Sequence, residues 1–174
     1  KDILVTGCCG GMGSAICKKL IEQNYRVFGI DKSITTENSE NFFQFECDVT
    51  STESVKNVFN KIKEKTNSLF AIVHTSGIYD LDSLIEIDEN RFNKIFQVNL
   101  FGAYRINKEF FSLLQKDSRI IITTSELAPL DPLPFTGLYG ITKTALEKYA
   151  FSLRMELQLL GIKVVVIRPG AVKT

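Results

Sequence analysis

Short apolar runs alternate with amphipathic stretches along the whole chain. The runs predict strands, and they occupy residues 2–6, 26–31, 43–48, 69–74, 119–124 and 163–167. The stretches between them place apolar residues at helical spacing and predict helices over 12–23, from Thr50 onward, over 88–116 and over 139–160. The polar segment 32–41 is predicted to be a loop. Strands that alternate with helices predict a doubly wound parallel α/β sheet, a Rossmann-type three-layer sandwich.

Local signals refine this pattern at two helix starts. Thr50-Ser51-Thr52-Glu53 reads as a capping box, and Asp88 is suited to cap the long helix that follows it. The chain contains no linker, repeat or low-complexity tract. We therefore expect residues 1–174 to form a single domain that buries its own core.

The composition excludes several classes of protein. A hydrophobic fraction of 44% and a charged fraction of 24% are ordinary for a globular domain, and a net charge of +1 does not favour nucleic acid or an anionic membrane as partner. No apolar run approaches the length of a membrane span, and no signal peptide is recognisable. We therefore expect a cytoplasmic protein.

The four cysteines do not predict a metal site. They form no Cys-x-x-Cys pair, and the one histidine, His74, is far from them in sequence, so a zinc site is not expected. Cys8 and Cys9 lie beside a predicted helix N-terminus, where a thiol pKa can be lowered. We expect them mainly to fill the turn.

A glycine-rich turn connects the first predicted strand to the first predicted helix. The segment contains Gly7, Gly10, Gly11 and Gly13, and such a strand–turn–helix brings backbone amides and a helix N-terminus to a pyrophosphate. The next strand ends in Asp31, which is suited to bind a ribose diol. Lys32 beside it could instead attract a 2′-phosphate, but no basic residue lies among Cys8, Cys9 and Gly10, so NAD is favoured over NADP.

A group of candidate catalytic residues lies in the later part of the chain. Tyr139 and Lys143 are four residues apart and share one face of a predicted helix, where an ammonium can lower the pKa of a phenol towards the working range. Ser125 follows an apolar strand and can donate a hydrogen bond to a substrate oxygen. Glu126 beside it could contact a polar substrate. On its own a Tyr and Lys pair at this spacing is common, and the glycine-rich turn strengthens the interpretation.

Together these segments resemble the short-chain dehydrogenase/reductase family, in its short, single-domain branch. Thr6-Gly7-x-x-x-Gly11-x-Gly13, which includes Met12, is similar to its cofactor motif, and Tyr139-x-x-x-Lys143 with Ser125 is similar to its catalytic motif. The resemblance adds Asn99 as a fourth catalytic residue and further cofactor contacts at Asp48, Val49, Gly77 and the loop Pro169-Gly170-x-x-x-Thr174. The turn also fits the family's extended branch through Gly10, but the interval from Ser125 to Tyr139 and the Pro-Gly loop argue against that branch.

The chain departs from the family after the fourth predicted strand. His74-Thr-Ser-Gly77 stands where the family usually has Asn-Asn-Ala-Gly. The final glycine is kept, and His74 is interpreted as a structural replacement rather than a catalytic group. The resemblance also implies that the chain is truncated before the substrate lid and the last strand, which would leave strand 163–167 at an uncovered edge.

The resemblance implies hydride transfer between NAD, or less favourably NADP, and a small-molecule carbonyl or secondary alcohol. In that interpretation Tyr139 exchanges the hydroxyl proton and Ser125 polarises the same oxygen. Lys143 holds the nicotinamide ribose and lowers the Tyr139 pKa, and Asn99 holds a relay water. As a buried amide, Asn99 could instead be a satisfied core residue. The alternatives are a non-catalytic dinucleotide-binding sensor or scaffold, and a structural fragment without a ligand.

Apolar residues beyond those needed for one sheet face suggest self-association. The candidates lie on the two long predicted helices, and in the resembling family these helices pair across a two-fold axis, so we expect a homodimer or homotetramer. The alternative is that these side chains join the core while polar neighbours such as Lys108 and Glu156 face solvent. The candidates are Phe101, Tyr104, Phe111, Tyr149, Leu153 and Leu157.

Overall fold

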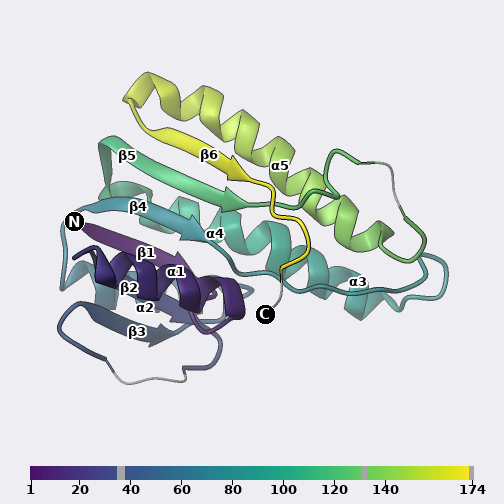
Figure 1. The fold of residues 1–174 in the computed structure, drawn as a ribbon, viewed down its shortest axis with the longest axis horizontal. Helices are drawn as coiled ribbons and strands as arrows, with labels where there is room; N and C mark the ends of the chain where they lie inside the picture. The colour runs from purple at the N-terminus through teal and green to yellow at the C-terminus, as the bar shows by residue number, and fades with distance from the viewer. Residues whose placement is uncertain (35–37, 131–132, 173–174) are drawn as a thin grey trace.

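A parallel sheet of six strands forms the centre of the molecule (Figure 1). The computed structural model describes residues 1–34, 38–130 and 133–172. The strands lie in the order β3-β2-β1-β4-β5-β6, so the chain winds outward from β1 to β3 and then crosses to β4 on the other side. Their bounds are β1 (Asp2–Thr6), β2 (Arg26–Asp31), β3 (Phe42–Glu46), β4 (Leu69–His74), β5 (Leu114–Thr123) and β6 (Lys163–Ile167). This is the predicted doubly wound fold, and β1 and β4 flank its switch point.

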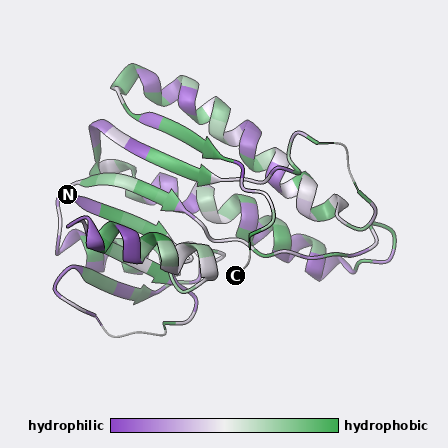
Figure 2. Cartoon of the chain, in the orientation of Figure 1, coloured by the Kyte–Doolittle hydropathy of each residue, from purple (hydrophilic) through white to green (hydrophobic). Residues whose placement is uncertain are grey.

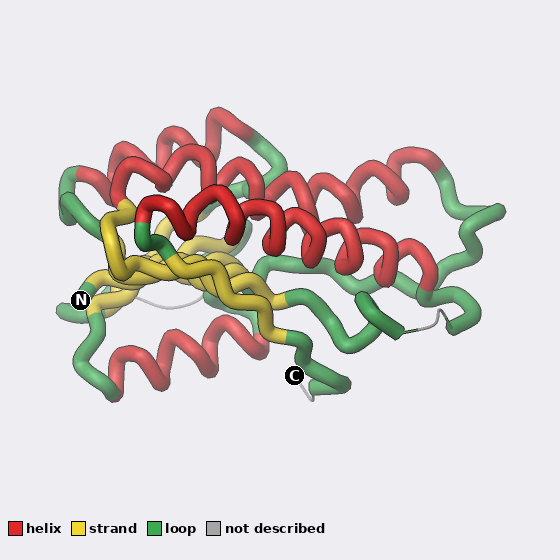
Figure 3. The backbone as a smooth tube through the Cα atoms, turned by 90° about the horizontal axis from the view of Figure 1, so that it is seen from above, coloured by secondary structure: helices red, strands yellow, loops and turns green. Residues whose placement is uncertain are grey.

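Helices cover the two faces of the sheet unequally (Figure 3). On one face, α1 (Gly11–Glu22) packs against the strands β1, β2 and β4. On the other, α2 (Thr52–Lys63), α4 (Gly102–Phe110) and α5 (Gly137–Leu157) bury a larger apolar cluster. The helix α3 (Glu89–Phe96) continues this layer beyond the sheet (Figure 1). Short helical turns complete the fold: η1 (Gln97–Phe101), η2 (Phe111–Leu113) and η3 (Gln158–Leu160).

The core follows from the sequence pattern. Alternate residues of the central strands point to opposite faces, so Leu4 joins the large cluster whereas Ile3 and Val5 face α1. Because both faces of the sheet are covered, successive residues of the strands are mostly apolar (Figure 2). None of the helices within the described ranges is both long and apolar enough to span a membrane.

The predicted helix over 88–116 is shorter than expected. It is interrupted by the π-helical turn η1 and ends at Phe110, with one further turn to Leu113. Leu114 is already buried in the sheet and pairs with Leu69, and the Ser118 hydroxyl donates to the Leu69 carbonyl. The apolar side chains near the end of the predicted helix therefore belong to an early, irregular start of β5.

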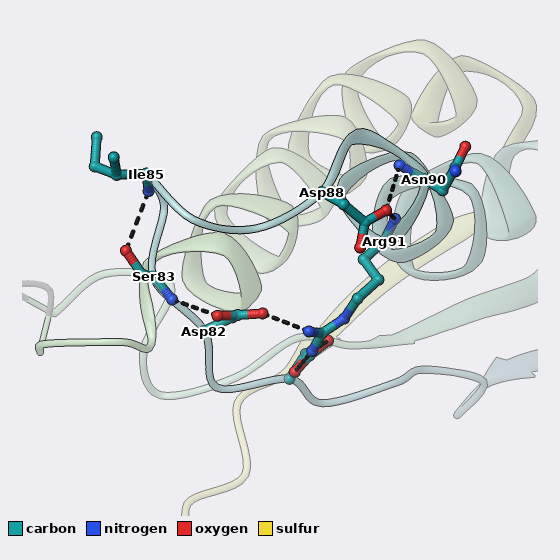
Figure 4. Close-up of polar contacts among 7 residues, drawn as sticks. Asp82, Ser83, Ile85, Asp88, Asn90 and Arg91 are labelled. Atoms are coloured by element: carbon teal, nitrogen blue, oxygen red, sulfur yellow. Dashed lines mark hydrogen bonds and ion pairs between the residues drawn. The ribbon is translucent and has the colours of Figure 1, made fainter.

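The predicted capping box at Thr50–Glu53 is wrong. Ser51 is the N-cap of α2, and its hydroxyl accepts from the Ser54 amide at 3.2 Å. Thr50 precedes the cap, and its amide and hydroxyl both donate to the Asp48 carboxylate. Asp88, in contrast, caps α3 as expected, accepting from the amides of Asn90 and Arg91 (Figure 4).

The prediction that Leu157 belongs to an exposed apolar stripe is also wrong. Leu157 is buried in the core, because its position on α5 faces β6. Tyr149 and Leu153 are only partly buried and pack against the same core. Phe101, Tyr104 and Phe111 are exposed, as the predicted stripe requires.

Candidate active site

A cleft of about 670 Å³ opens at the carboxyl ends of the central strands. It brings together segments that are far apart in the sequence: the start of α1, the loops after β4 and β5, the first turns of α5 and the loop after β6. Ligands of open parallel sheets bind at this edge. Eight of the residues singled out from the sequence line the cleft: Met12, Gly77, Ser125, Glu126, Tyr139, Lys143, Pro169 and Gly170.

The glycine-rich turn has the geometry of a phosphate cradle. Gly7 has φ +68°, and a Cβ there would lie 2.8 Å from the Ser76 amide nitrogen. At Gly13 a Cβ would lie 1.9 Å from the Gly7 carbonyl oxygen. Neither position tolerates a side chain. The turn leads directly into the N-terminus of α1 at Gly11, so the residues fit the pyrophosphate of a dinucleotide.

Asp31 ends β2 close to this turn. One of its carboxylate oxygens accepts from the Cys9 amide at 2.9 Å, and the other accepts from the Lys32 amide at 2.7 Å. These bonds fix the carboxylate beside the glycine-rich turn. Asp31 is not among the described residues that line the cleft; it lies farther along the sheet edge, towards β3.

Asp48 and Val49 lie farther along the same edge. Burial opposes the charge of Asp48, but the hydrogen bond from the Thr50 hydroxyl is the largest influence and holds its pKa below the ordinary value. The Lys32 ammonium lies 3.4 Å from the second Asp48 oxygen. The carbonyl of Val49 accepts from Arg105. Asp48 and Lys32 line a separate polar hollow beside α2.

The phenol of Tyr139 lies in the first turns of α5 and faces the cleft. Burial raises its pKa, the neighbouring Ser125 hydroxyl opposes this, and Tyr79 adds to it. The expected lowering of the Tyr139 pKa is therefore wrong for this structure. Ser125 itself is buried, and its oxygen accepts from the Leu127 amide at 3.2 Å.

Lys143 is buried beneath Tyr139, one turn along α5. Its ammonium lies 5.7 Å from the centre of the Tyr139 ring and donates to the Thr123 carbonyl at 3.1 Å. Burial lowers its pKa to about 8. Gly77 lies directly above, because a Cβ there would be 3.3 Å from this ammonium. The Lys143 charge is thus directed at a backbone carbonyl rather than at the phenol.

Asn99 occupies the π-helical turn η1 and is buried. Its side-chain oxygen accepts from the Ile78 amide at 2.8 Å, and its nitrogen donates to the Ile78 carbonyl at 3.0 Å and the Thr142 hydroxyl at 3.1 Å. Turns of this kind often occur at functional sites. Both N–H groups of the amide are paired and its oxygen accepts one bond, as the core interpretation requires; its role in holding a water stays a prediction.

The loop after β6 closes the cleft on another side. The Glu126 amide donates to the Pro169 carbonyl at 3.2 Å, and a Cβ on Gly170 would lie 3.0 Å from the Glu126 carboxylate. Arg168 pairs with Glu147 of α5, with Nε 2.9 Å from the carboxylate, which fixes the base of the loop. Thr174, predicted to complete this motif, lies outside the described residues.

Sequence reasoning missed the role of two threonine hydroxyls: that of Thr75, which stands where the family usually has its second asparagine after β4, and that of Thr6 at the end of β1. The Thr75 hydroxyl donates to the Thr6 carbonyl at 2.6 Å, and the Thr6 hydroxyl accepts from the amides of Thr75 and Ser76. These bonds join the ends of β1 and β4 beneath the glycine-rich turn. The Thr75-Ser76 pair in the departing motif was the available signal.

His74 is structural, as interpreted. It is buried, and its Nε2 lies 2.7 Å from the Asn107 side-chain oxygen, while the Asn107 nitrogen donates to the Tyr149 hydroxyl. Burial lowers the His74 pKa to about 4, so the ring is neutral at neutral pH.

The Cys8 thiol beside the turn is a packing group. Cys8 is buried, and burial raises rather than lowers its pKa, which overturns the alternative of an activated thiol there. Its sulfur lies 3.7 Å from that of Cys9, and both lie within 4.8 Å of an Asp31 oxygen. The Asp31 oxygens already accept two backbone bonds, and a buried thiol of raised pKa is a poor source of thiolate.

Comparison with known proteins identifies the family. The model of the short chain dehydrogenase family matches residues 1–174. The chain belongs to the short-chain dehydrogenase/reductase family. It is 33% identical over 185 residues to estradiol 17-beta-dehydrogenase 2 of Mus musculus, covering 100% of this chain and 49% of the relative. It is 30% identical over 181 residues to the NADPH-dependent 1-acyldihydroxyacetone phosphate reductase of Schizosaccharomyces pombe, covering 100% of this chain and 60% of the relative. The chain thus spans about half to three fifths of these family members.

Solved structures share the fold. A short chain dehydrogenase family protein from Francisella tularensis superposes with a TM-score of 0.90 at 26% identity, covering 98% of this chain and 69% of that one. The aldohexose dehydrogenase of Thermoplasma acidophilum, at 23% identity and a TM-score of 0.90, shares the fold over 98% of this chain and 66% of its own.

Proposed function

We propose that this chain is the cofactor-binding and catalytic part of an oxidoreductase that interconverts a carbonyl and a secondary alcohol. The observation that carries the proposal is the single cleft in which Ser125, Tyr139 and Lys143 meet the start of α1 and the Pro169-Gly170 loop. Two relatives are named a dehydrogenase and a reductase, which supports the reaction class.

The residues of the cleft have distinct roles in this proposal. A bound nicotinamide cofactor supplies or accepts the hydride. Tyr139, whose pKa is raised by burial, is protonated at neutral pH and can donate its proton to a carbonyl oxygen. The Ser125 hydroxyl donates to the same oxygen and polarises it. In the reverse direction Tyr139 must first lose its own proton, and as the phenolate it takes the alcohol proton.

Lys143 and Asn99 act beside this pair. Within the described residues the Lys143 ammonium makes one hydrogen bond, to Thr123, so two of its three N–H donors remain for ribose hydroxyls. A ligand that draws the ammonium from Thr123 towards the phenol would then lower the Tyr139 pKa. Asn99 supports the loop above Lys143 through Ile78 and is proposed to hold the water of a proton relay.

The cofactor is proposed to be NAD. The Asp31 carboxylate is fixed beside the glycine-rich turn and would accept ribose hydroxyls while repelling a 2′-phosphate. Lys32, the cation nearest to this position in sequence, is paired with Asp48 at 3.4 Å. The substrate is a small molecule; Leu127, Leu133 and Val172 line the cleft and favour an apolar body.

The test is the variant Tyr139→Phe in the full-length protein. Because general acid–base groups contribute roughly 10²- to 10⁴-fold in rate, we expect a loss of turnover of that order, with the cofactor dissociation constant changed by no more than a few-fold. Turnover is followed by nicotinamide absorbance over a panel of carbonyls and alcohols, and cofactor affinity by calorimetry. Retention of more than about a tenth of the activity would exclude Tyr139 as the acid. Cofactor binding without any turnover would favour a sensor, and no binding would favour a structural fragment.

A further inference from the structure

Tyr79, in the loop that follows β4, packs on the ring of Tyr139. The two ring centroids are 4.7 Å apart at an interplanar angle of 76°, an edge-to-face pair. Tyr79 lines the cleft, yet 59% of it is exposed. An exposed aromatic ring has fewer positions open to it when the backbone that carries it is fixed. The residues on both sides of Tyr79 are fixed, each by a different helix.

The first attachment is at Ile78. Its amide donates to Asn99 at 2.8 Å, and its carbonyl accepts from Asn99 at 3.0 Å. Both bonds go to one buried side chain in η1. The backbone immediately before Tyr79 is therefore held at two points by the helical layer.

The second attachment is at Asp80 and Asp82, and it comes from α3. A terminal nitrogen of Arg91 lies 2.6 Å from both oxygens of Asp80, and its other terminal nitrogen lies 2.5 Å from Asp82 (Figure 4). A guanidinium is planar and can bind two carboxylates in fixed directions. Arg91 itself is in the first turn of α3, whose N-terminus is capped by Asp88. We refer to Asp80, Asp82 and Arg91 as the arginine clamp.

The same loop is docked on the segment that carries Tyr139. The Asp82 amide donates to the Phe135 carbonyl at 3.0 Å. Leu84 packs against the start of α5, since a Cβ on Gly137 would lie 2.9 Å from its side chain. The loop therefore contacts the chain two to four residues before Tyr139, in addition to the ring contact itself.

We propose that Tyr79 is a positioning residue that holds the Tyr139 ring in the cleft, and that Arg91 acts on catalysis through Tyr79. This inference rests on the proposed function, in which Tyr139 exchanges the proton. A ring held on one side has fewer orientations, and misplacement of an acid relative to its acceptor is costly in rate. Neither Tyr79 nor Arg91 needs to touch the substrate oxygen for this effect.

The contact is tested first without turnover. The full-length protein is labelled with 3-fluorotyrosine, and the fluorine resonance of Tyr139 is assigned by its loss in Tyr139→Phe. We expect Tyr79→Ala to shift this resonance, because the ring current of Tyr79 is removed, and Arg91→Ala to shift it in the same direction. Lys94→Ala, an exposed substitution on the same helix, is the matched control and should leave it unchanged. A Tyr139 resonance that does not respond to Arg91→Ala would overturn the role of the arginine clamp.

The catalytic effect is tested by a double-mutant cycle. Tyr79→Ala should lower kcat about two- to tenfold, the size expected for an edge-to-face pair, with cofactor affinity unchanged. Tyr79→Phe keeps the ring and should retain kcat within about twofold. Arg91→Ala should lower kcat by a similar factor. The double variant of Tyr79→Ala and Arg91→Ala should lower kcat no further, because the effects of two residues that act through one contact are not additive.

The controls separate positioning from general destabilisation. Phe92→Ala removes another part-exposed aromatic contact, the stacked pair with Phe96 at 5.3 Å, and should leave kcat unchanged. Arg91→Lys keeps the charge but not the planar fork, and it provides a milder variant if Arg91→Ala unfolds. The proposal would be overturned if the kcat losses of the two single variants multiplied in the double variant. It would also be overturned if the substitutions changed KM and left kcat unchanged. Absence of turnover in the unsubstituted protein would reject the proposed function, while the fluorine experiment would still decide the contact.

Discussion

At the level of single residues, burial sets the chemistry of the cleft more than charge does. It raises the Tyr139 pKa and lowers that of Lys143 to about 8. Both shifts have desolvation as their largest cause. At neutral pH Tyr139 is thus a neutral phenol and Lys143 is an ammonium, which donates to the Thr123 carbonyl. A ligand that moves the Lys143 ammonium towards the Tyr139 phenol would lower the Tyr139 pKa.

Asp31 gives a prediction about cofactor choice. Asp31→Ala should improve NADP affinity about tenfold, or about 1.4 kcal/mol, because a carboxylate no longer repels the 2′-phosphate. NAD affinity should fall less. Asp31→Asn is the matched variant, since it removes the charge while keeping an acceptor for the Cys9 amide. Dissociation constants for both cofactors, measured by calorimetry, check this. Tighter binding of NADP than NAD by the unsubstituted protein would mean that Lys32 dominates.

At the level of elements, one buried polar network joins strand to helices. His74 at the end of β4 contacts Asn107 of α4, which contacts Tyr149 of α5. Asn107 bridges the other two residues, with its oxygen against His74 and its nitrogen donating to Tyr149, and a buried network of this kind specifies how its elements pack. His74 therefore contributes to the register between the sheet and the helical layer.

The network predicts how stability depends on pH. The His74 pKa falls from 6.5 in the unfolded chain to about 4 in the folded one. The unfolded chain therefore binds more protons between these values, and the free energy of unfolding should fall by about 3 kcal/mol as the pH falls through this window. The chain contains one histidine, so no other imidazole in it obscures the effect.

The matched variant for this prediction is His74→Gln, which offers a neutral amide donor to Asn107 without titrating. Urea unfolding at pH 7 and pH 5 should show a smaller loss of stability for His74→Gln than for the unsubstituted protein. His74→Leu should cost about 1–3 kcal/mol at pH 7, because it leaves the Asn107 oxygen unpaired. If stability depended equally on pH in the unsubstituted protein, His74→Gln and His74→Leu, His74 would not be the group that causes the pH dependence.

At the level of the whole molecule, the helical face suggests an assembly. Phe101, Tyr104 and Phe111 are 41–43% exposed, and they recur on one side of η1, α4 and η2. On α5, Ile141, Phe151 and Met155 are exposed, in place of the buried Leu157. Exposed apolar residues gathered on neighbouring helices favour a partner surface, and a second copy of the chain fits the isologous contact of a two-fold axis.

Light scattering tests this assembly. We expect the full-length protein to have at least the mass of a dimer at micromolar concentration, and the double variant Phe101→Ser and Tyr104→Ser to shift it towards monomer by removing apolar area. Leu159→Ser, which replaces a residue 86% exposed in η3, is the control and should leave the mass unchanged. A monomer mass for the unsubstituted protein would reject the idea.

The alternation of apolar runs and amphipathic stretches determined the order of strands and helices, because period and turn residues are local properties of the chain. The motif spacing likewise predicted that Ser125, Tyr139 and Lys143 lie together, and they line one cleft. Tertiary structure decided what depends on distant neighbours. Burial raises the Tyr139 pKa, Ser51 rather than Thr50 caps α2, and Leu114 pairs with Leu69 in the sheet instead of extending the predicted helix. The contact between Tyr79 and Tyr139 joins residues 60 positions apart, and the arginine clamp joins the loop after β4 to α3; no local pattern encodes either contact.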